Sequence, residues 1–297
     1  MRNKSARYYA FLSIAAAIAT IALKLGAYLL TNSVGFLSDA LESGVNLVAA
    51  FGAVWAITYA AKPPDEEHAF GHSKAEYFSS GFEGALILFA AVGIMITAVP
   101  RLINPQPLEQ LSLGLVLSII ASMINGGVAF VLLKAGKRLH SITLRADAHH
   151  LLTDVWTSIG VILGIFLVSV TGWLILDPLI ALLVAVNIVW TGLKLIQESG
   201  SALLDAAIPL EEQKIITEIF VPYERQHVRF HAMRTRMAGT RKFVSFHILV
   251  PGAWTVQQGH DLCEEIESAI CRALPHINVF THLEPLEDPK AWNDQDL

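Results

Sequence analysis

The chain has 297 residues, of which 54% are hydrophobic and only 16% are charged, against about 25% charged residues in a typical soluble domain. So few charges could not cover the surface of a soluble protein of this size, and the composition therefore indicates a membrane protein. The net charge of −5 and the lack of a long Lys/Arg block argue against a nucleic-acid-binding arm. Cys263 and Cys271 are too few for a disulfide framework and are expected to be reduced, inert thiols.

Six long apolar runs occupy the first two thirds of the chain. They cover residues 9–30, 37–60, 78–99, 111–134, 151–171 and 178–196. Each reaches or approaches the roughly 20 residues that a helix needs to cross a bilayer, so we predict a bundle of six transmembrane helices. The first run is longer than the apolar part of a signal peptide, and five more follow it, so we expect it to be retained.

Lys and Arg residues of the short loops gather on one predicted side of the membrane. That side carries Arg2, Lys4, Arg7, Lys62, Lys74, Lys137, Arg138 and Arg145, whereas the other side carries only Arg101. Because positive charge stays on the cytoplasmic side, both termini are predicted to be cytoplasmic. The brevity of the chain and the lack of a targeting segment favour a bacterial inner membrane.

Polar side chains interrupt the second and fifth spans, where such groups are costly and usually functional. The two triplets are Asp39, Glu42 and Asn46, and Asp147, His150 and Asp154. Each follows the spacing i, i+3, i+7, which places its members on one helix face. Two such helices packed face to face would bring Glu42 and Asn46 close to His150 and Asp154.

Four N and O donors from two helices suit a tetrahedral ion such as zinc. The carboxylates Glu42 and Asp154 would balance a divalent cation, and the His150 nitrogen favours zinc, iron or cobalt over magnesium or calcium. The plainer alternative is that these groups only form hydrogen bonds between helices. Asp39 and Asp147, one turn away, are expected to be entry or helix-capping groups rather than ligands.

The segment between the second and third spans contains Asp65, His68 and His72. These are again metal-ligand residue types at compatible spacing, although an ordinary polar loop would contain them too.

The composition from about Gly200 onward is that of a soluble domain. We predict a helix at 211–220, strands at 227–237 and 241–250, a helix at 256–274 and a strand at 278–284. This αββαβ order indicates a small ferredoxin-like α+β domain at 205–297, following the six-helix transmembrane domain at 1–204. His231, His247, His260, His282 and Glu284 lie on these elements. They are either half-buried side chains or a second metal site.

Several motifs resemble those of the cation diffusion facilitator family over nearly the whole chain. They are Asp65-x-x-His68-x-Phe70-Gly71-His72-x-Lys74, Arg145-Ala146-Asp147-x-x-His150-x-x-x-Asp154, His231-x-x-Arg234-x-Arg236-x-x-Gly239 and His282-x-Glu284-Pro285. The resemblance implies a homodimeric antiporter, and not an enzyme, that expels Zn²⁺ or a related divalent ion (Fe²⁺, Co²⁺, Cd²⁺ or Mn²⁺) in exchange for protons.

The resemblance also implies a role for each group of candidate residues. Transport would use Glu42, Asn46, His150 and Asp154; Asp65, His68 and His72 would form a loop site; and His231, His247, His260, His282 and Glu284 would form a binuclear cytoplasmic site that stabilises the dimer. Lys74 and Asp205 occupy the positions of an interlocking salt bridge at the dimer contact.

The chain departs from the family pattern at the second span. Glu42 and Asn46 stand where better-known members have Asp or His and then Asp, and a histidine-rich loop between spans four and five is missing apart from His140. Because the Asn46 amide carries no charge, the metal preference is not fixed by the resemblance. A non-transporting metal sensor or scaffold is the alternative. An intramembrane metalloenzyme is disfavoured, because the chain has no His-Glu-x-x-His motif and all four ligand positions are filled by protein.

Overall fold

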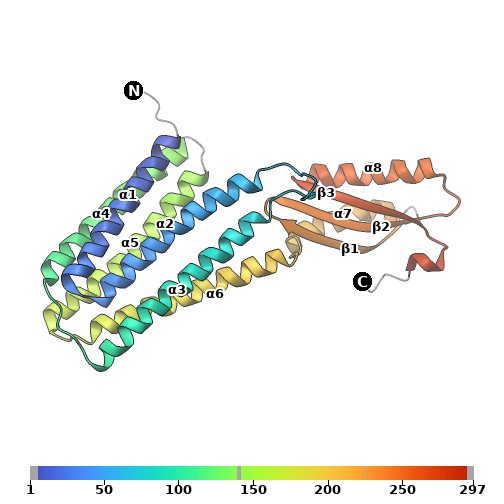
Figure 1. Cartoon of the computed structure of the whole chain (residues 1–297). Coiled ribbons are helices and arrows are strands. Elements are labelled where there is room, and N and C mark those ends of the chain that lie inside the picture. Colours follow the sequence, from blue (N-terminus) through green and yellow to red (C-terminus); the bar gives the residue numbers. More distant parts are fainter. Residues whose placement is uncertain (1–5, 139–141, 226, 293–297) are drawn as a thin grey trace. The chain divides into compact units, whose positions relative to one another are not determined.

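The computed structural model describes residues 6–138, 142–225 and 227–292. Arg2, Lys4 and His140 lie outside the described residues, as do the side chains of Arg7 and Arg145. The helices and strands are α1 (Ala6–Thr31), α2 (Val34–Ala60), α3 (Ala75–Ile103), α4 (Leu111–Arg138), α5 (Ile142–Thr171), α6 (Leu176–Leu203), α7 (Leu210–Glu224), β1 (Arg229–Ala238), β2 (Arg241–Val250), α8 (Val256–Ala273) and β3 (Ile277–Pro285) (Figure 1).

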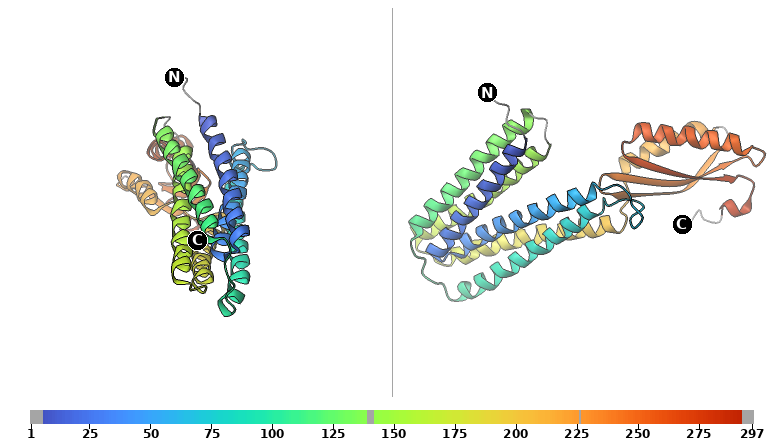
Figure 2. Two further views of the ribbon diagram at one scale, coloured as in Figure 1. Left: turned by 90° about the vertical axis from the view of Figure 1, so that its left-hand side faces the viewer. Right: turned by 45° about the horizontal axis from the view of Figure 1, so that its top comes forward.

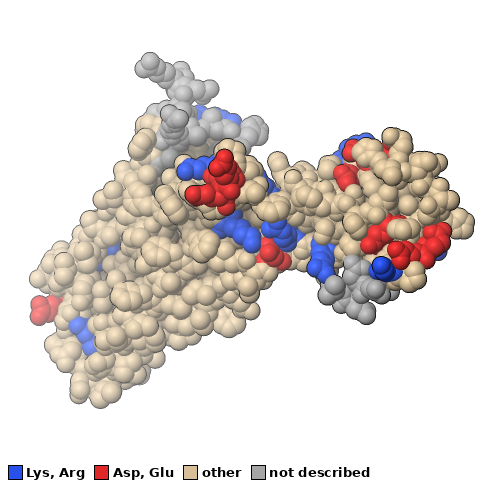
Figure 3. All heavy atoms as spheres, turned by 45° about the vertical axis from the view of Figure 1, so that its right-hand side comes forward, with Lys and Arg blue, Asp and Glu red and all other residues tan. Residues whose placement is uncertain are grey.

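Helices α1 to α6 confirm the six predicted spans, since all six are long and apolar enough to cross a membrane. Large apolar side chains point outward from them, such as Phe89 with 80% and Trp190 with 74% of the residue surface exposed. The surface of these helices is almost free of charge in the view of Figure 3. Apolar groups face outward in this way where the surrounding medium is lipid.

The chain forms two compact units, residues 1–54 with 79–196 and residues 55–78 with 197–297. In the first unit, α4 packs along both α1 and α5 (Figure 2). Helices α3 and α6 approach closely through Gly84 and Gly192. A Cβ atom at Gly84 would lie 3.0 Å from the Gly192 carbonyl oxygen, and one at Gly192 would lie 3.1 Å from that of Gly84. Small residues allow such close backbone contact in membrane bundles.

Asp177, in the first turn of α6, caps the N-terminus of α2. Its carboxylate accepts hydrogen bonds from the amides of Val34 at 2.9 Å and Gly35 at 3.0 Å, and from the Ser33 hydroxyl at 2.5 Å. The first amides of a helix have no partner within the helix, and a carboxylate there also interacts favourably with the helix dipole. Asp177 is 1% exposed, so this cap fixes the end of α2 to the start of α6.

The C-terminal part of the second unit confirms the predicted α+β fold. Its sheet has the order β1-β2-β3, with β1 and β2 antiparallel and β2 and β3 parallel. Both helices cover one face, where Ile216 and Phe220 of α7 and Ile266 of α8 join alternate residues of β2 such as Phe246 and Ile248 in one core.

The two cysteines of this domain are free thiols. Burial raises the pKa of the Cys263 thiol, which favours its protonated, less nucleophilic form.

The hairpin between β1 and β2 contacts the first turn of α3 and the residues just before it. The Gly239 amide donates to the Tyr77 hydroxyl at 2.8 Å. Gly239 has a φ of +59°, and a Cβ atom on it would lie 2.9 Å from the Ser73 carbonyl oxygen. Both the backbone conformation and the space therefore require glycine at this position.

Candidate metal-binding sites

Helices α2 and α5 meet at two of the four predicted transport-site residues. The Asn46 amide donates to the Asp154 carboxylate at 3.1 Å, and Asp154 is only 7% exposed. Glu42, one turn before Asn46, has a buried Oε2 atom with no hydrogen-bond partner. An unpaired carboxylate oxygen inside a membrane helix is costly, and a cation would satisfy it.

His150 lies one turn before Asp154 on α5 and is exposed. The charges of His150 and Asp154 act on each other, as do those of Asp154 and Glu42. Within the described part of the chain, sets of three or more His, Cys, Asp or Glu donors within 4.8 Å of one another occur at two other places. The structure thus brings Asn46 to Asp154 but does not gather Glu42, His150 and Asp154 into such a set.

Asp39 does not have the entry or capping role expected of it. It lies inside α2, is 1% exposed, and accepts a hydrogen bond from the Lys24 ammonium on α1 at 2.7 Å. The prediction for Asp39 was wrong because the sequence does not show that Lys24 of another helix lies beside it. Asp147 is half-buried on α5.

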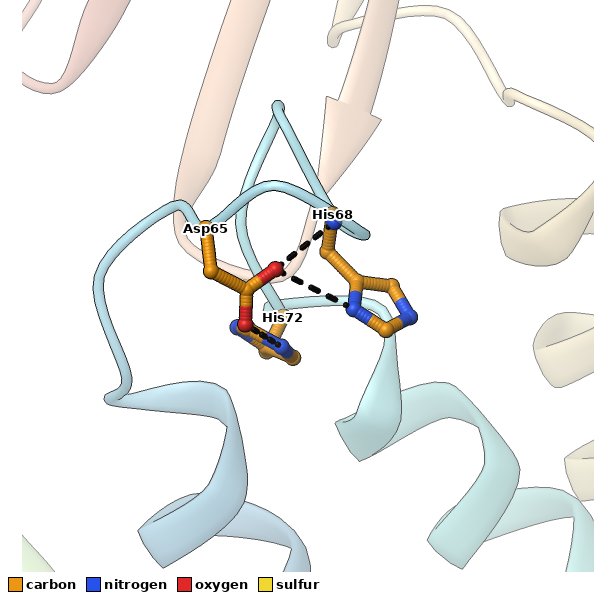
Figure 4. Close-up of side chains that lie close together, drawn as sticks. All are labelled: Asp65, His68 and His72. Atoms are coloured by element: carbon orange, nitrogen blue, oxygen red, sulfur yellow. Dashed lines mark hydrogen bonds and ion pairs between the residues drawn. The ribbon is translucent and has the colours of Figure 1, made fainter.

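The loop between α2 and α3 brings Asp65, His68 and His72 together (Figure 4). The Asp65 carboxylate lies 3.4 Å from His68 Nδ1 and 3.2 Å from His72 Nε2. The His68 amide also donates to Asp65 at 2.7 Å. That hydrogen bond and the two imidazoles beside it hold the pKa of the Asp65 carboxyl below its usual value, which keeps it in the anionic form that binds metals.

His72 is the buried member of this loop cluster, with a side chain 2% exposed. Its ring meets the Tyr59 ring edge-on at 4.8 Å, a neighbour that the sequence analysis did not identify. The His72 Nδ1 atom is buried without a hydrogen-bond partner. The residues present therefore fit a divalent metal, with two imidazoles and a carboxylate as donors.

The cytoplasmic domain places three histidines in one row across its sheet. His231 of β1 pairs in register with His247 of β2, which pairs with His282 of β3. Glu284 lies two residues beyond His282 on the same strand, so its side chain faces the same side. Its carboxylate lies 3.1 Å from His231 Nε2, 3.3 Å from His247 Nδ1 and 3.5 Å from His282 Nε2.

The ligand atoms of His231, His247 and Glu284 lie within 4.8 Å of one another, so their chemistry and spacing fit a metal ion. His282 is at the edge of this cluster, with a side chain 65% exposed, and its ring centre lies 5.0 Å from that of His247. His260 is exposed on α8 and is not a member of the cluster. The Trp292 ring lies 5.9 Å from the His231 ring, a contact that the sequence gave no signal to find.

Lys74 and Asp205 form an ion pair within one chain, with Nζ to Oδ1 at 2.8 Å. Arg236 approaches the same oxygen at 3.4 Å, and Lys74 also donates to the Leu203 carbonyl. The hydrogen bond from Lys74 is the main cause that lowers the pKa of the Asp205 carboxyl.

Comparison with known proteins assigns the chain to a family. Residues 10–204 match the cation efflux transmembrane domain, and residues 208–286 match the cation efflux protein cytoplasmic domain. The chain belongs to the cation efflux family. It is therefore a multi-pass membrane transporter that exports cations, and it is not an enzyme.

Relatives in this family match the chain almost from end to end. One is a Synechocystis protein named uncharacterized transporter sll1263, 59% identical over 100% of this chain and 96% of the relative. Another is the cation-efflux pump FieF of Klebsiella pneumoniae, 30% identical over 93% of this chain and 91% of FieF. The metal-bound C-terminal domain of the CzcD transporter from Thermotoga maritima is 29% identical over 28% of this chain and 99% of that domain, with a TM-score of 0.25.

Proposed function

We propose that this cation efflux protein exports a divalent transition metal, with Zn²⁺ favoured over Fe²⁺, Co²⁺, Cd²⁺ and Mn²⁺, in exchange for protons. It works as a homodimer in a bacterial inner membrane with both termini in the cytoplasm. Residues 1–204 carry the ion, and residues 205–297 bind metal and hold the dimer. The observation that carries the proposal is the meeting of Asn46 and Asp154 beside the unpaired Glu42 oxygen, inside two apolar helices.

The transport cycle alternates access to the donors Glu42, Asn46, His150 and Asp154. Carboxylates and imidazoles bind a metal only in their deprotonated forms, so proton binding and metal binding oppose each other. A cation captured from the cytoplasm is released on the far side when protons occupy these groups. His150 is exposed and Asp154 buried on one face of α5, which makes His150 the group that meets the ion first.

Metal flux into proteoliposomes under an imposed pH gradient tests this function. Asp154→Ala should abolish flux because it removes a buried carboxylate donor, while the protein stays folded. Asp261→Ala is the matched control, since Asp261 is an exposed carboxylate on α8. Wild-type flux in Asp154→Ala would overturn the site, and flux independent of the pH gradient would overturn proton exchange.

A metal sensor that does not transport is the second candidate. It is favoured by one observation: His231, His247 and Glu284 are gathered within 4.8 Å, whereas Glu42, His150 and Asp154 are not. The same flux experiment separates the two functions. A protein that binds Zn²⁺ through its cytoplasmic cluster but carries no ion across the vesicle membrane would be a sensor.

A further inference from the structure

A lysine is buried in the middle of the helical unit. The Lys24 side chain on α1 is 1% exposed, and its Nζ donates to Asp39 Oδ1 at 2.7 Å and to Ser43 Oγ at 2.8 Å. A charged side chain inside a membrane helix is costly unless it is paired, and such residues are usually functional. The Asp39 side chain is 2% exposed, so the pair is sealed from both lipid and water.

Ser158 extends this pair to a third helix. Its hydroxyl lies 2.9 and 3.0 Å from the two Asp39 carboxylate oxygens. Lys24, Asp39 and Ser158 thereby join α1, α2 and α5. These buried hydrogen bonds hold α1, α2 and α5 in fixed positions relative to one another.

The pair borders the proposed transport site without supplying a donor to it. Ser43, which bonds Lys24, directly follows Glu42, and Ser158 lies one helical turn beyond Asp154. The charges of both Lys24 and Asp39 act on Glu42 and on Asp154. A change of charge at either member of the pair is therefore felt by the donors.

The charges of the two carboxylate donors and of the Lys24–Asp39 pair add up to the value that a divalent cation neutralises. Glu42 and Asp154 contribute two negative charges, and Lys24 and Asp39 cancel each other. Loss of Lys24 would leave three negative charges around the ion, and loss of Asp39 would leave one. Resting on the proposed function, we infer that the Lys24–Asp39 pair sets the net charge of the transport site, so that Lys24 determines how tightly a divalent cation is held.

A purely structural role for the pair makes a different prediction. If the pair only holds helices together, removal of either partner leaves a buried charge unpaired and harms the protein in the same sense. If the pair sets charge, the two single substitutions move the apparent affinity for the cation in opposite directions. The sign of the change in KM therefore separates the two roles.

The test compares Zn²⁺ flux of the full-length protein in proteoliposomes for Lys24→Met, Asp39→Asn and the double variant. We expect KM to fall about tenfold in Lys24→Met and to rise about tenfold in Asp39→Asn, because each substitution changes by one the charge that acts on the divalent ion at short range in a protein interior. Turnover should be slower in Lys24→Met, because the ion is held too tightly. In the double variant KM should return toward the wild-type value.

Two further variants serve as controls. Lys24→Arg keeps the charge and should keep KM, whereas Ser158→Ala removes hydrogen bonds to Asp39 without a change of charge and should shift KM by less than about threefold. The inference would be overturned if KM moved in the same direction in both single variants. It would also be overturned if the KM of the double variant were no closer to the wild-type KM than that of Asp39→Asn. If Lys24→Met does not fold, Lys24→Gln takes its place, because its amide can still donate a hydrogen bond to Asp39 without carrying a charge; a KM that rises in Lys24→Gln as it does in Asp39→Asn would overturn the inference. Absence of flux in the wild type would instead overturn the proposed function, and this inference with it.

Discussion

Asn46 distinguishes this site, because an amide stands where a charged donor is expected. Its nitrogen donates to Asp154 at 3.1 Å, which satisfies the carboxylate when no ion is bound. Under the proposed function, Asn46 binds a cation through its amide oxygen in place of the nitrogen, since only the oxygen has lone pairs to offer. Asn46 would then exchange its hydrogen bond to Asp154 for a bond to the ion.

Asn46→Asp should raise the affinity for divalent cations, because it adds a third negative charge and a stronger donor. We expect the KM for Zn²⁺ to fall about tenfold and the order of preference among the five ions to change, as measured by competition in the flux assay. Asn278→Asp makes the same chemical change at an exposed position of β3 and should alter neither. An unchanged ion preference in Asn46→Asp would mean that residue 46 is not a donor.

The Lys74–Asp205 pair should make stability depend on pH in acid. The hydrogen bond from Lys74 lowers the folded-state pKa of Asp205 below the ordinary value of 3.8. The pair's contribution is thus complete above that ordinary value and is lost as the pH falls through the lower, folded-state pKa. With side chains 34% and 48% exposed, it amounts to about 0–1 kcal/mol.

Thermal melting of the full-length protein from about pH 7 to about pH 1 measures this contribution, because the scan must pass below the folded-state pKa of Asp205. Asp205→Asn should melt slightly lower than wild type near neutral pH, and the two should converge in acid. A difference that persists at the lowest pH would mean that the Asp205 carboxylate is not what stabilises the contact.

At the scale of single residues, the sequence indicated which polar side chains lie inside the membrane helices but not which side chains they contact. Glu42 and Asp154 could be proposed as donors because carboxylates in an apolar helix are rare and their spacing defines a face. The partner of Lys24 could not be predicted, because it depends on how α1 and α2 are rotated about their axes. Asp39 was assigned the wrong role for the same reason.

At the scale of elements, the contact of α3 with α6 depends on the absence of side chains at Gly84 and Gly192. Gly84→Val should lower the stability of the protein by about 1–3 kcal/mol, because its Cβ would meet the Ile196 side chain at 2.8 Å and the Gly192 carbonyl oxygen at 3.0 Å. Melting in detergent measures the loss. Gly93→Val on the same helix is the control, since nothing lies within 4 Å of that position; equal losses in both variants would contradict the close contact.

The sequence predicted which segments form helices and strands better than it predicted which of these elements contact one another. Runs of apolar residues predicted all six spans, and αββαβ patterning predicted the small domain, because burial of apolar groups dominates both. The ends of the helices differed from the apolar runs. Helix α5 begins at Ile142, before the apolar run that starts at residue 151, because polar residues such as Asp147 continue the helix. The Asp177 cap had no signal in the sequence, as its partner amides lie over 140 residues away.

At the scale of the whole molecule, we propose three separate places at which the chain binds metal. They are the Asp154 region, the loop cluster around His72 and the sheet cluster around Glu284. We expect Asp154→Ala, His68→Ala and His231→Ala each to remove only its own share of the Zn²⁺ bound to the purified full-length protein, and the losses to add in the triple variant. Metal content after dialysis measures them; a single substitution that empties the protein of metal would contradict three independent sites.

The spacing of histidines predicted the sheet cluster only in part. His231, His247 and His282 became one row because the register of three strands aligned them, and strand register follows from packing on the opposite face. His260 was expected beside them, but a helix that covers the other face of the sheet cannot be oriented from sequence spacing. The proximity of Asp65, His68 and His72 could be expected from the sequence because all three lie within one short segment.

The bond from the Gly239 amide to the Tyr77 hydroxyl has a consequence for the way the protein is made. The two residues are 162 positions apart, and synthesis proceeds at about 5–20 residues per second. The segment around Ser73 and Tyr77 therefore waits roughly ten to thirty seconds after it leaves the ribosome before the hairpin that completes it exists. A chain whose translation stops before residue 239 would present this segment uncovered, giving proteases a way to recognise unfinished copies.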